Sequence, residues 1–136
     1  MRIILFYAPS FWFKTYQKVL HEVPDHDVEK KTESAVVVFY QAEAEDAEKM
    51  GSVVTKLVKN IKWLAGKFNT KTVVLHSFSH LSLSKAPSAL TGEIIETAKE
   101  KLARAGYSVI ETPFGYLNEW KLHVAGESLA KVYKEF

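Results

Sequence analysis

The stretch richest in reactive side chains is HSFSHLS, which spans His76 to Ser82. It follows a short apolar run and precedes a helical pattern. Ligands of α/β proteins bind where strands end, because backbone N–H and C=O groups are free there. His80 in such a place can titrate, donate a hydrogen bond or stack on a base. Taken by itself, the pattern favours an ordinary polar loop over a functional one.

The second stretch is PFGYLNEWKLHVAG, from Pro113 to Gly126. Its first three residues predict a tight turn, whose glycine lets another group approach the backbone closely. Polar and apolar residues then alternate, so Lys121 and Trp120 lie on opposite faces of a predicted strand. A charged Lys121 in a cleft would stabilise developing negative charge, and a desolvated neutral one would act as a base. Spacing alone favours a solvated strand lysine.

Other catalytic patterns are weak. Ser82 to Lys85 matches the Ser-x-x-Lys pattern of some acyl-transfer enzymes, but the companion motifs are absent. The chain has no cysteine, which excludes a cysteine nucleophile, disulfides and thiolate metal sites. The histidines form no His-Glu-x-x-His helix, and the cluster between His21 and Asp27 lies in an apparent loop. We therefore predict no metal and no other cofactor.

Strands and helices must alternate to position these stretches. Apolar runs and alternation predict strands at 2–7, 35–41, 72–75, 107–111 and 119–125. Apolar residues at three- and four-residue steps predict helices at 44–68 and 87–105, and the end of the chain, 127–136, fits a short helix. Residues 11–20 fit an extended segment or a short helix, and 21–34 read as a loop. This order predicts a single α/β domain over 1–136, with a mixed β-sheet and helices packed on one side.

Composition agrees with one folded domain. The chain has 136 residues, of which 47% are hydrophobic and 25% charged, enough for an ordinary core. Its formal net charge of +2 permits a nucleic-acid partner without arguing for one. No apolar run is long enough to cross a membrane, and the apolar start ends by Pro9. We expect a soluble, cytoplasmic protein with no membrane partner.

These segments together resemble the archaeal threonyl-tRNA synthetase editing domain. The resemblance rests on His80-Leu81-Ser82 after a strand, Ala86-Pro87-Ser88 opening a helix, and Pro113 to Tyr116 followed five residues later by Lys121. The first strand, MRIILFYAPSF, is also similar. The resemblance covers essentially the whole chain and is looser between Thr15 and Ala35. The order and spacing of the motifs are specific, whereas any single motif is not.

The resemblance implies a fold like that of D-aminoacyl-tRNA deacylases, usually a homodimer, and hydrolysis of mischarged seryl-tRNA(Thr). Editing is needed because one missing methyl group costs a threonine site only about 1–3 kcal/mol of discrimination. The implied partners are the 3′ aminoacyl-adenosine end of tRNA and a threonyl-tRNA synthetase catalytic subunit. The implied catalytic residues are Lys121 and His80. The implied substrate-binding residues are Ser77, Ser79, Pro113, Phe114, Gly115 and Tyr116.

Three segments depart from the pattern of the relatives. Ala125 to Lys131 stands where relatives tend to read Lys-Gly-His-Pro-Leu-Ala-Glu, and Leu117 to Glu119 where they tend to be aromatic and basic. His76 to Phe78 lacks their usual proline. These changes remove positive charge near the expected RNA entrance. A second hypothesis is therefore a catalytically degenerate module that binds tRNA or a separate synthetase, and a third is a small-ligand domain with no RNA role.

Overall fold

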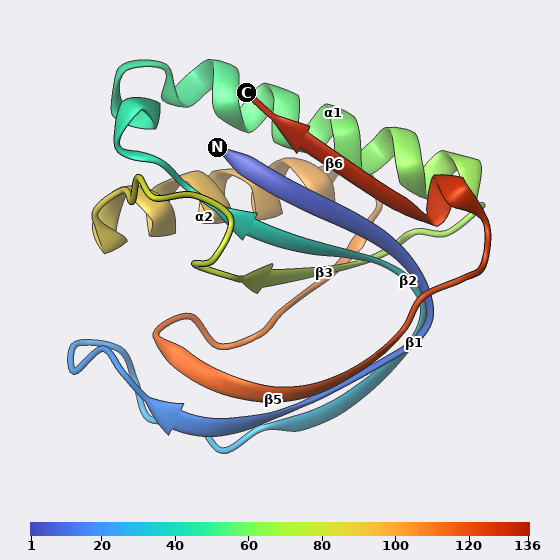
Figure 1. Cartoon of the computed structure of the whole chain (residues 1–136), viewed down its shortest axis with the longest axis horizontal. Helices are drawn as coiled ribbons and strands as arrows, with labels where there is room; N and C mark the ends of the chain where they lie inside the picture. Colours follow the sequence, from blue (N-terminus) through green and yellow to red (C-terminus); the bar gives the residue numbers. More distant parts are fainter.

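A six-stranded mixed sheet carries two helices on one face (Figure 1). The computed structural model describes all 136 residues. The strands are β1 Arg2–Lys18, β2 Glu29–Gln41, β3 Thr72–Ser77, β4 Ser108–Glu111, β5 Tyr116–His123 and β6 Lys131–Glu135. The helices are α1 Met50–Lys67 and α2 Ser88–Arg104, and short 3₁₀ turns lie at Ala44–Glu48 and Ser128–Ala130. The sheet order is β4-β3-β2-β1-β5, with β6 also paired to β1.

The long strand β1 holds the sheet together. One edge of β1 pairs with β2 along almost the whole length of β1, and the two strands run antiparallel to each other. Its other edge is shared, because β6 pairs with residues 2–6 and β5 with residues 10–18. The strands β2, β3 and β4 are parallel neighbours. The sheet curls along β1, so that β5 lies below β3 in Figure 1.

The helices bury the stripes that their sequences predict. All six apolar residues expected on one side of α1 are buried, namely Val53, Val54, Leu57, Val58, Ile61 and Leu64. They pack with α2 and with one face of the sheet in a cluster of 20 buried residues. The end of α2 is also as predicted. Gly106 has a positive φ of 89°, which glycine adopts without strain, and the Tyr107 N–H donates to the Leu102 carbonyl at 3.0 Å.

A second, smaller core lies on the sheet face away from the helices. Strand alternation sends Val36 and Val38 to the helices and Val37 and Phe39 to this other face. The smaller core comprises seven buried residues, Ala8, Phe11, Phe13, Ala35, Val37, Phe39 and Val74. Phe78 and Leu122 pack at its border. This core joins the curled half of the sheet, which carries β5, to the half that carries β3.

The structure confirms the predicted fold class, shows which alternative holds for residues 11–18, and corrects three assignments. Residues 11–18 are extended and continue β1, and residues 29–34 of the expected loop belong to β2. The expected helix over 44–68 is interrupted at Lys49, which separates a 3₁₀ turn from α1. The predicted helix at 127–136 is wrong, because Lys131–Glu135 is the strand β6. The free edge of β1 overrides the weak local preference of this segment.

Both ends of the described chain meet beside β1. The Met1 ammonium is buried, and its nitrogen lies 2.8 Å from Asp46 Oδ1 and 3.1 Å from Glu43 Oε1. The Phe136 N–H donates to the Met1 carbonyl at 2.9 Å. The ion pair therefore ties the start of β1 to the turn that precedes α1. Neither α1 nor α2 has the length and apolar character that a membrane-crossing helix requires.

Candidate active site

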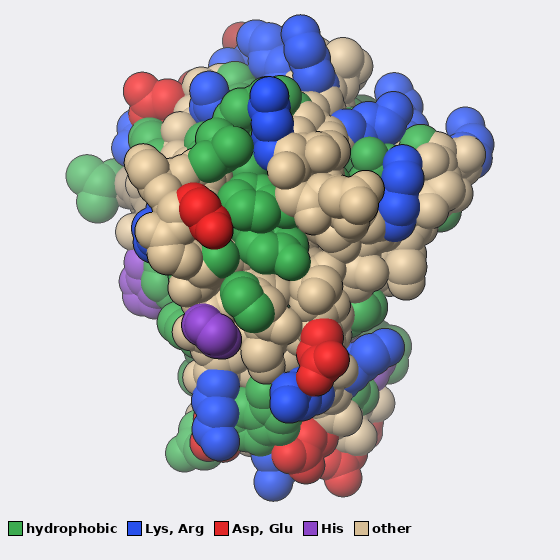
Figure 2. Space-filling model, turned by 90° about the vertical axis from the view of Figure 1, so that its right-hand side faces the viewer, with side chains coloured by type: hydrophobic (Ala, Val, Ile, Leu, Met, Phe, Trp, Pro, Cys, Tyr) green, Lys and Arg blue, Asp and Glu red, His purple; other side chains and the backbone are tan.

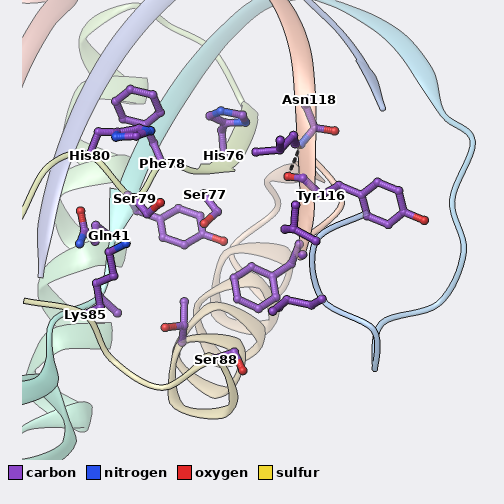
Figure 3. Close-up of a pocket in the computed structure, with 18 of the residues that line it drawn as sticks. Gln41, His76, Ser77, Phe78, Ser79, His80, Lys85, Ser88, Tyr116 and Asn118 are labelled. Atoms are coloured by element: carbon purple, nitrogen blue, oxygen red, sulfur yellow. Dashed lines mark hydrogen bonds between the residues drawn. The ribbon is translucent and has the colours of Figure 1, made fainter. Parts of the chain in front are cut away.

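A cavity of about 420 Å³ opens between two segments that are far apart in sequence. One wall is the end of β3 and the loop that leads to α2, and the other is the turn that leads into β5. Figure 3 shows this arrangement, with His76, Ser77 and Ser79 on one side and Tyr116 and Asn118 on the other. The volume falls within the range of small-molecule sites. The two stretches that the sequence singles out therefore meet at one cavity.

Four of the side-chain hydrogen bonds that hold the loop after β3 come from Gln41, at the end of β2. The Gln41 amide oxygen accepts from the Leu81 and Ser82 N–H groups, both at 2.8 Å. The Gln41 amide nitrogen donates to the Ser82 and Ser84 carbonyls, both at 2.9 Å. The Ser82 hydroxyl also donates to Glu43 at 2.7 Å. Because the Gln41 hydrogen bonds occupy backbone N–H and C=O groups of the loop, the residues that precede it are held in a defined position.

The opposite wall depends on Gly115. Its φ is +84°, a value that disfavours any residue with a Cβ. A Cβ at this position would also lie 3.0 Å from both methyl carbons of Val23 and 3.1 Å from Leu20. The Gly115 carbonyl accepts from the Val19 N–H at 2.8 Å. The turn is thus packed directly against residues 19–23, as the Pro-Phe-Gly signal requires.

His76 lies at the base of the cavity and is almost fully buried. Its Nδ1 lies 2.9 Å from the Thr112 hydroxyl oxygen. Aromatic rings surround it, and the Phe39 centroid is 4.7 Å and the Trp120 centroid 6.1 Å away. Burial lowers the pKa of His76 to about 4, so the imidazole is neutral at physiological pH. The cavity therefore has a neutral, polar group set in an aromatic floor.

Six of the eight predicted site residues line the cavity. They are His80, Ser77, Ser79, Phe114, Gly115 and Tyr116. His80 is exposed at the rim, with its ring 5.1 Å from the Phe78 ring. Tyr116 contributes mainly through its backbone side, because its ring points away in Figure 3 and its hydroxyl accepts from the His26 N–H at 2.7 Å. Pro113 instead lines a neighbouring hollow with Lys99 and Glu111.

The structure does not bring Lys121 to the cavity. Lys121 and Trp120 are consecutive in β5 and lie on opposite faces, and Trp120 is the one that lines the cavity. Lys121 is exposed on the outer face of the curled sheet, where its Nζ lies 5.1 Å from the ring centroid of Trp12, its cross-strand partner. The Lys121 side chain therefore does not reach the cavity of its own chain. Its catalytic role stays a prediction.

Three further residues of the lining were not among the predicted site residues, namely Tyr40, Lys85 and Asn118. Lys85 is the only lysine, arginine or carboxylate in the lining, and no salt bridge neutralises it. Burial raises the pKa of Tyr40 well above its ordinary value, so its phenol stays neutral. Asn118 donates to the Tyr116 carbonyl at 3.3 Å, while its Oδ1 is buried without a partner. Of these, only Lys85 had a sequence signal, as the lysine of the Ser-x-x-Lys match.

Comparison with known sequences gives a consistent result. The sequence model of the Archaea-specific editing domain of threonyl-tRNA synthetase matches residues 1–136. The chain is 32% identical over 142 residues to a threonine–tRNA ligase of Hyperthermus butylicus, covering 100% of this chain and 23% of that protein. It is 31% identical over 138 residues to that of Staphylothermus marinus, and 30% over 135 residues to that of Thermococcus kodakarensis. These matches cover 98% and 97% of this chain, and 22% of each ligase. The chain thus spans less than a quarter of the length of these relatives.

Comparison with solved structures concerns the fold alone. The c-Myc DNA unwinding element binding protein superposes with a TM-score of 0.67 at 11% sequence identity. The match covers 100% of this chain and 99% of that chain. The curled mixed sheet with two helices is therefore a fold that this chain shares with that protein over its whole described length.

Proposed function

The chain belongs to the family of the Archaea-specific editing domain of threonyl-tRNA synthetase, and we propose that it hydrolyses mischarged aminoacyl-tRNA, with seryl-tRNA(Thr) as its substrate. The observation that carries the proposal is the convergence of the His80 loop and the Phe114 turn on one cavity. These two segments are the ones that the family resemblance assigns to the terminal adenosine and the aminoacyl group. The proposed partners are the 3′ aminoacyl-adenosine end of the tRNA and a threonyl-tRNA synthetase catalytic subunit.

The reaction is the addition of water to the ester carbonyl, followed by cleavage of the bond between that carbon and the ribose oxygen. The products are the free amino acid and a tRNA with a free hydroxyl. An aminoacyl ester is already reactive, so positioning and electrostatic help are sufficient without a strong nucleophile. The serine hydroxyls of 77 and 79 and the free backbone groups of this loop would orient the aminoacyl end.

The cavity suggests how charge would be handled. Lys85 is an unpaired ammonium at its edge, and His80 is an exposed imidazole at its rim. A cation at the edge favours the negative charge that develops on the carbonyl oxygen or that the tRNA phosphates bring. The missing side chain of Gly115 lets the opposite wall pack against Val23 and Leu20, which fixes the position of that wall.

The direct test is deacylation of Ser-tRNA(Thr) against Thr-tRNA(Thr) by the wild type and three variants, His80→Ala, Lys85→Gln and Lys121→Gln. We expect the wild type to release serine faster than threonine. His80→Ala and Lys85→Gln should slow the reaction, because both side chains line the cavity. The Lys121→Gln variant tests whether Lys121 takes part in the reaction. Loss of activity would place Lys121 in the site through another chain or the RNA, and retained activity would restrict the site to the cavity. Negligible turnover of both substrates by the wild type would sink the proposal.

The catalytically degenerate module remains the second candidate, and one observation favours it. The lysine predicted to act in the site faces away from the cavity, and an asparagine at 118 lines it instead. This candidate predicts that the chain binds tRNA or a separate synthetase without hydrolysing Ser-tRNA(Thr). Co-purification with a threonyl-tRNA synthetase catalytic subunit, combined with no turnover, would establish it. The homodimer stays a prediction that analytical ultracentrifugation can check.

A further inference from the structure

Positive charge is concentrated in one continuous part of the chain. Residues 49–92 contain seven lysines and no acidic residue, although the whole chain has 18 basic and 16 acidic residues. Four of these lysines lie on α1, which has no Asp or Glu at all. The α1 lysine face is defined here as the exposed residues Lys56, Lys59, Lys62, Trp63 and Lys67. The formal net charge of the whole chain is only +2, so it does not reveal the positive charge of this face.

Helical spacing places these lysines on one side. With 100° per residue, the four lysines fall within an arc of roughly 140°, and they span about 16 Å along the axis. The buried stripe of α1 occupies the opposite arc, against the sheet and α2. Figure 2 shows many lysines and arginines toward the end of the molecule where α1 lies, with only a few carboxylates among them, and a closer mixture of both charges at the other end.

No carboxylate neutralises this face. The salt bridges of the structure involve Arg2, Lys18, Lys31, Lys99, Arg104 and the Met1 ammonium, and none involves a lysine of α1. An ordinary solvated helix mixes both signs and gains from i,i+4 pairs, as Arg104 and Glu100 do in α2. On α1 the like charges only repel each other, which costs stability unless an anionic partner is bound.

An aromatic ring interrupts the lysines. The Trp63 side chain is 41% exposed in the middle of the face. The Nζ of Lys134, from the adjacent strand β6, lies 5.9 Å from the Trp63 ring centroid. Lysines that flank an exposed aromatic ring match the surfaces on which proteins hold nucleic-acid backbones, where cations contact phosphates and rings contact sugars or bases.

We propose that the α1 lysine face binds the ribose-phosphate backbone of the tRNA whose aminoacyl end enters the cavity. The proposal rests on the proposed function for the identity of the RNA. Each lysine that neutralises a phosphate releases a condensed counterion, so the binding is sequence-independent and weakens steeply with salt. The face would anchor the body of the RNA, while the cavity distinguishes the aminoacyl group. Lys85, at the cavity, belongs to the same acid-free segment.

The test is binding of uncharged tRNA(Thr) to the 136-residue chain, measured by fluorescence anisotropy between 50 and 400 mM KCl. The variant is Lys56→Gln/Lys59→Gln/Lys62→Gln, which keeps good helix formers at exposed positions. We expect the slope of log K against log salt to become shallower by about 2–3, at roughly 0.9 per phosphate contact. The affinity at 0.1 M salt should fall by about a hundredfold.

A matched control removes the same charge elsewhere. Lys14→Gln/Lys30→Gln/Lys31→Gln alters three exposed lysines of β1 and β2 and should leave the slope nearly unchanged. An unchanged slope in the α1 variant, or an equal loss in the control, overturns the proposal. Circular dichroism of both variants verifies the fold.

Hydrolysis distinguishes this proposal from the function itself. A minimal substrate, 3′-seryl-adenosine, has no tRNA body, so the α1 variant should hydrolyse it at the wild-type rate while losing activity on Ser-tRNA(Thr) at low concentration. A wild type that binds tRNA through α1 but hydrolyses neither substrate would refute the proposed function and leave the binding face intact.

Discussion

Acidification should destabilise the fold through His76 well before the carboxylates titrate. The imidazole is 4% exposed, packed among aromatic rings, and has one polar partner, the Thr112 hydroxyl. Burial holds its pKa at about 4 in the folded chain, against about 6.5 in the unfolded chain. The unfolded state therefore binds a proton first as the pH falls. The stability conferred by the neutral imidazole is complete above pH 6.5 and is lost progressively between pH 6.5 and 4.

The size of this loss follows from the two pKa values. At pH 5 the unfolded histidine is almost fully protonated and the folded one hardly at all. The linkage relation then gives a loss of about 2 kcal/mol between pH 7 and pH 5, which rises to about 3 kcal/mol near pH 4. A loss of 2 kcal/mol is a large fraction of the stability of a domain of this size.

Urea denaturation at pH 7, 6 and 5 measures the effect. The wild type is compared with His76→Asn, whose amide keeps a hydrogen-bonding group beside Thr112 and does not titrate in this range. Carboxylates contribute equally to both proteins, so the difference between the two pH profiles isolates His76. We expect the wild type to lose about 2 kcal/mol more than the variant between pH 7 and pH 5. A further variant, His21→Asn, alters an exposed histidine and should follow the wild type. Parallel profiles for wild type and His76→Asn would refute the reasoning.

Three further substitutions have expected outcomes. Gly115→Ala should cost about 1–2 kcal/mol in urea denaturation and slow deacylation, because it adds a Cβ at a positive φ against a packed neighbour. Gln41→Leu removes four hydrogen bonds to the 81–84 loop and should cost about 3 kcal/mol, with faster amide hydrogen exchange in that loop; slow exchange would contradict the role of this side chain. Asp46→Asn leaves the buried Met1 ammonium without its nearest carboxylate and should cost about 3 kcal/mol at pH 7, and a change below 1 kcal/mol would contradict a buried ion pair.

The local sequence pattern is sufficient to predict the elements that bury a whole stripe of a helix or a whole face of a strand. The apolar residues of α1 and the run Val36 to Phe39 are buried as predicted, because each pattern matches one geometry only. The mixed segment from Phe11 to Lys18 is different. Phe11 and Phe13 face the smaller core, whereas Trp12, Tyr16 and the polar residues lie outside it, and the segment becomes a strand only because β5 and the start of β2 flank it. The decisive contacts are distant in sequence, so no local signal identifies them.

The sequence predicts which segments form the site, but it does not predict which face of β5 points into the cavity. The HSFSHLS and Pro-Phe-Gly stretches meet at the cavity because strand ends and turns carry recognisable residues. Alternation established that Trp120 and Lys121 face opposite ways, but only the pairing of Trp120 with Phe13 shows which face is inside. Gln41 was missed because a glutamine at the end of a buried strand has no motif, and its importance appears only in its four partners.

The shared edge of β1 has a consequence for how the chain folds. Along that edge β1, at the start of the domain, is paired by β5 and β6 near its end, and the Phe136 N–H donates to the carbonyl of Met1, 135 residues earlier. During synthesis β1 and β2 can form a hairpin, while the other edge of β1 stays unpaired until β5 and β6 emerge. Loop closure over such separations is slow, and an open strand edge is prone to pair with other chains. Nascent chains should therefore be most prone to aggregate after β2 has been made and before β5 closes the edge.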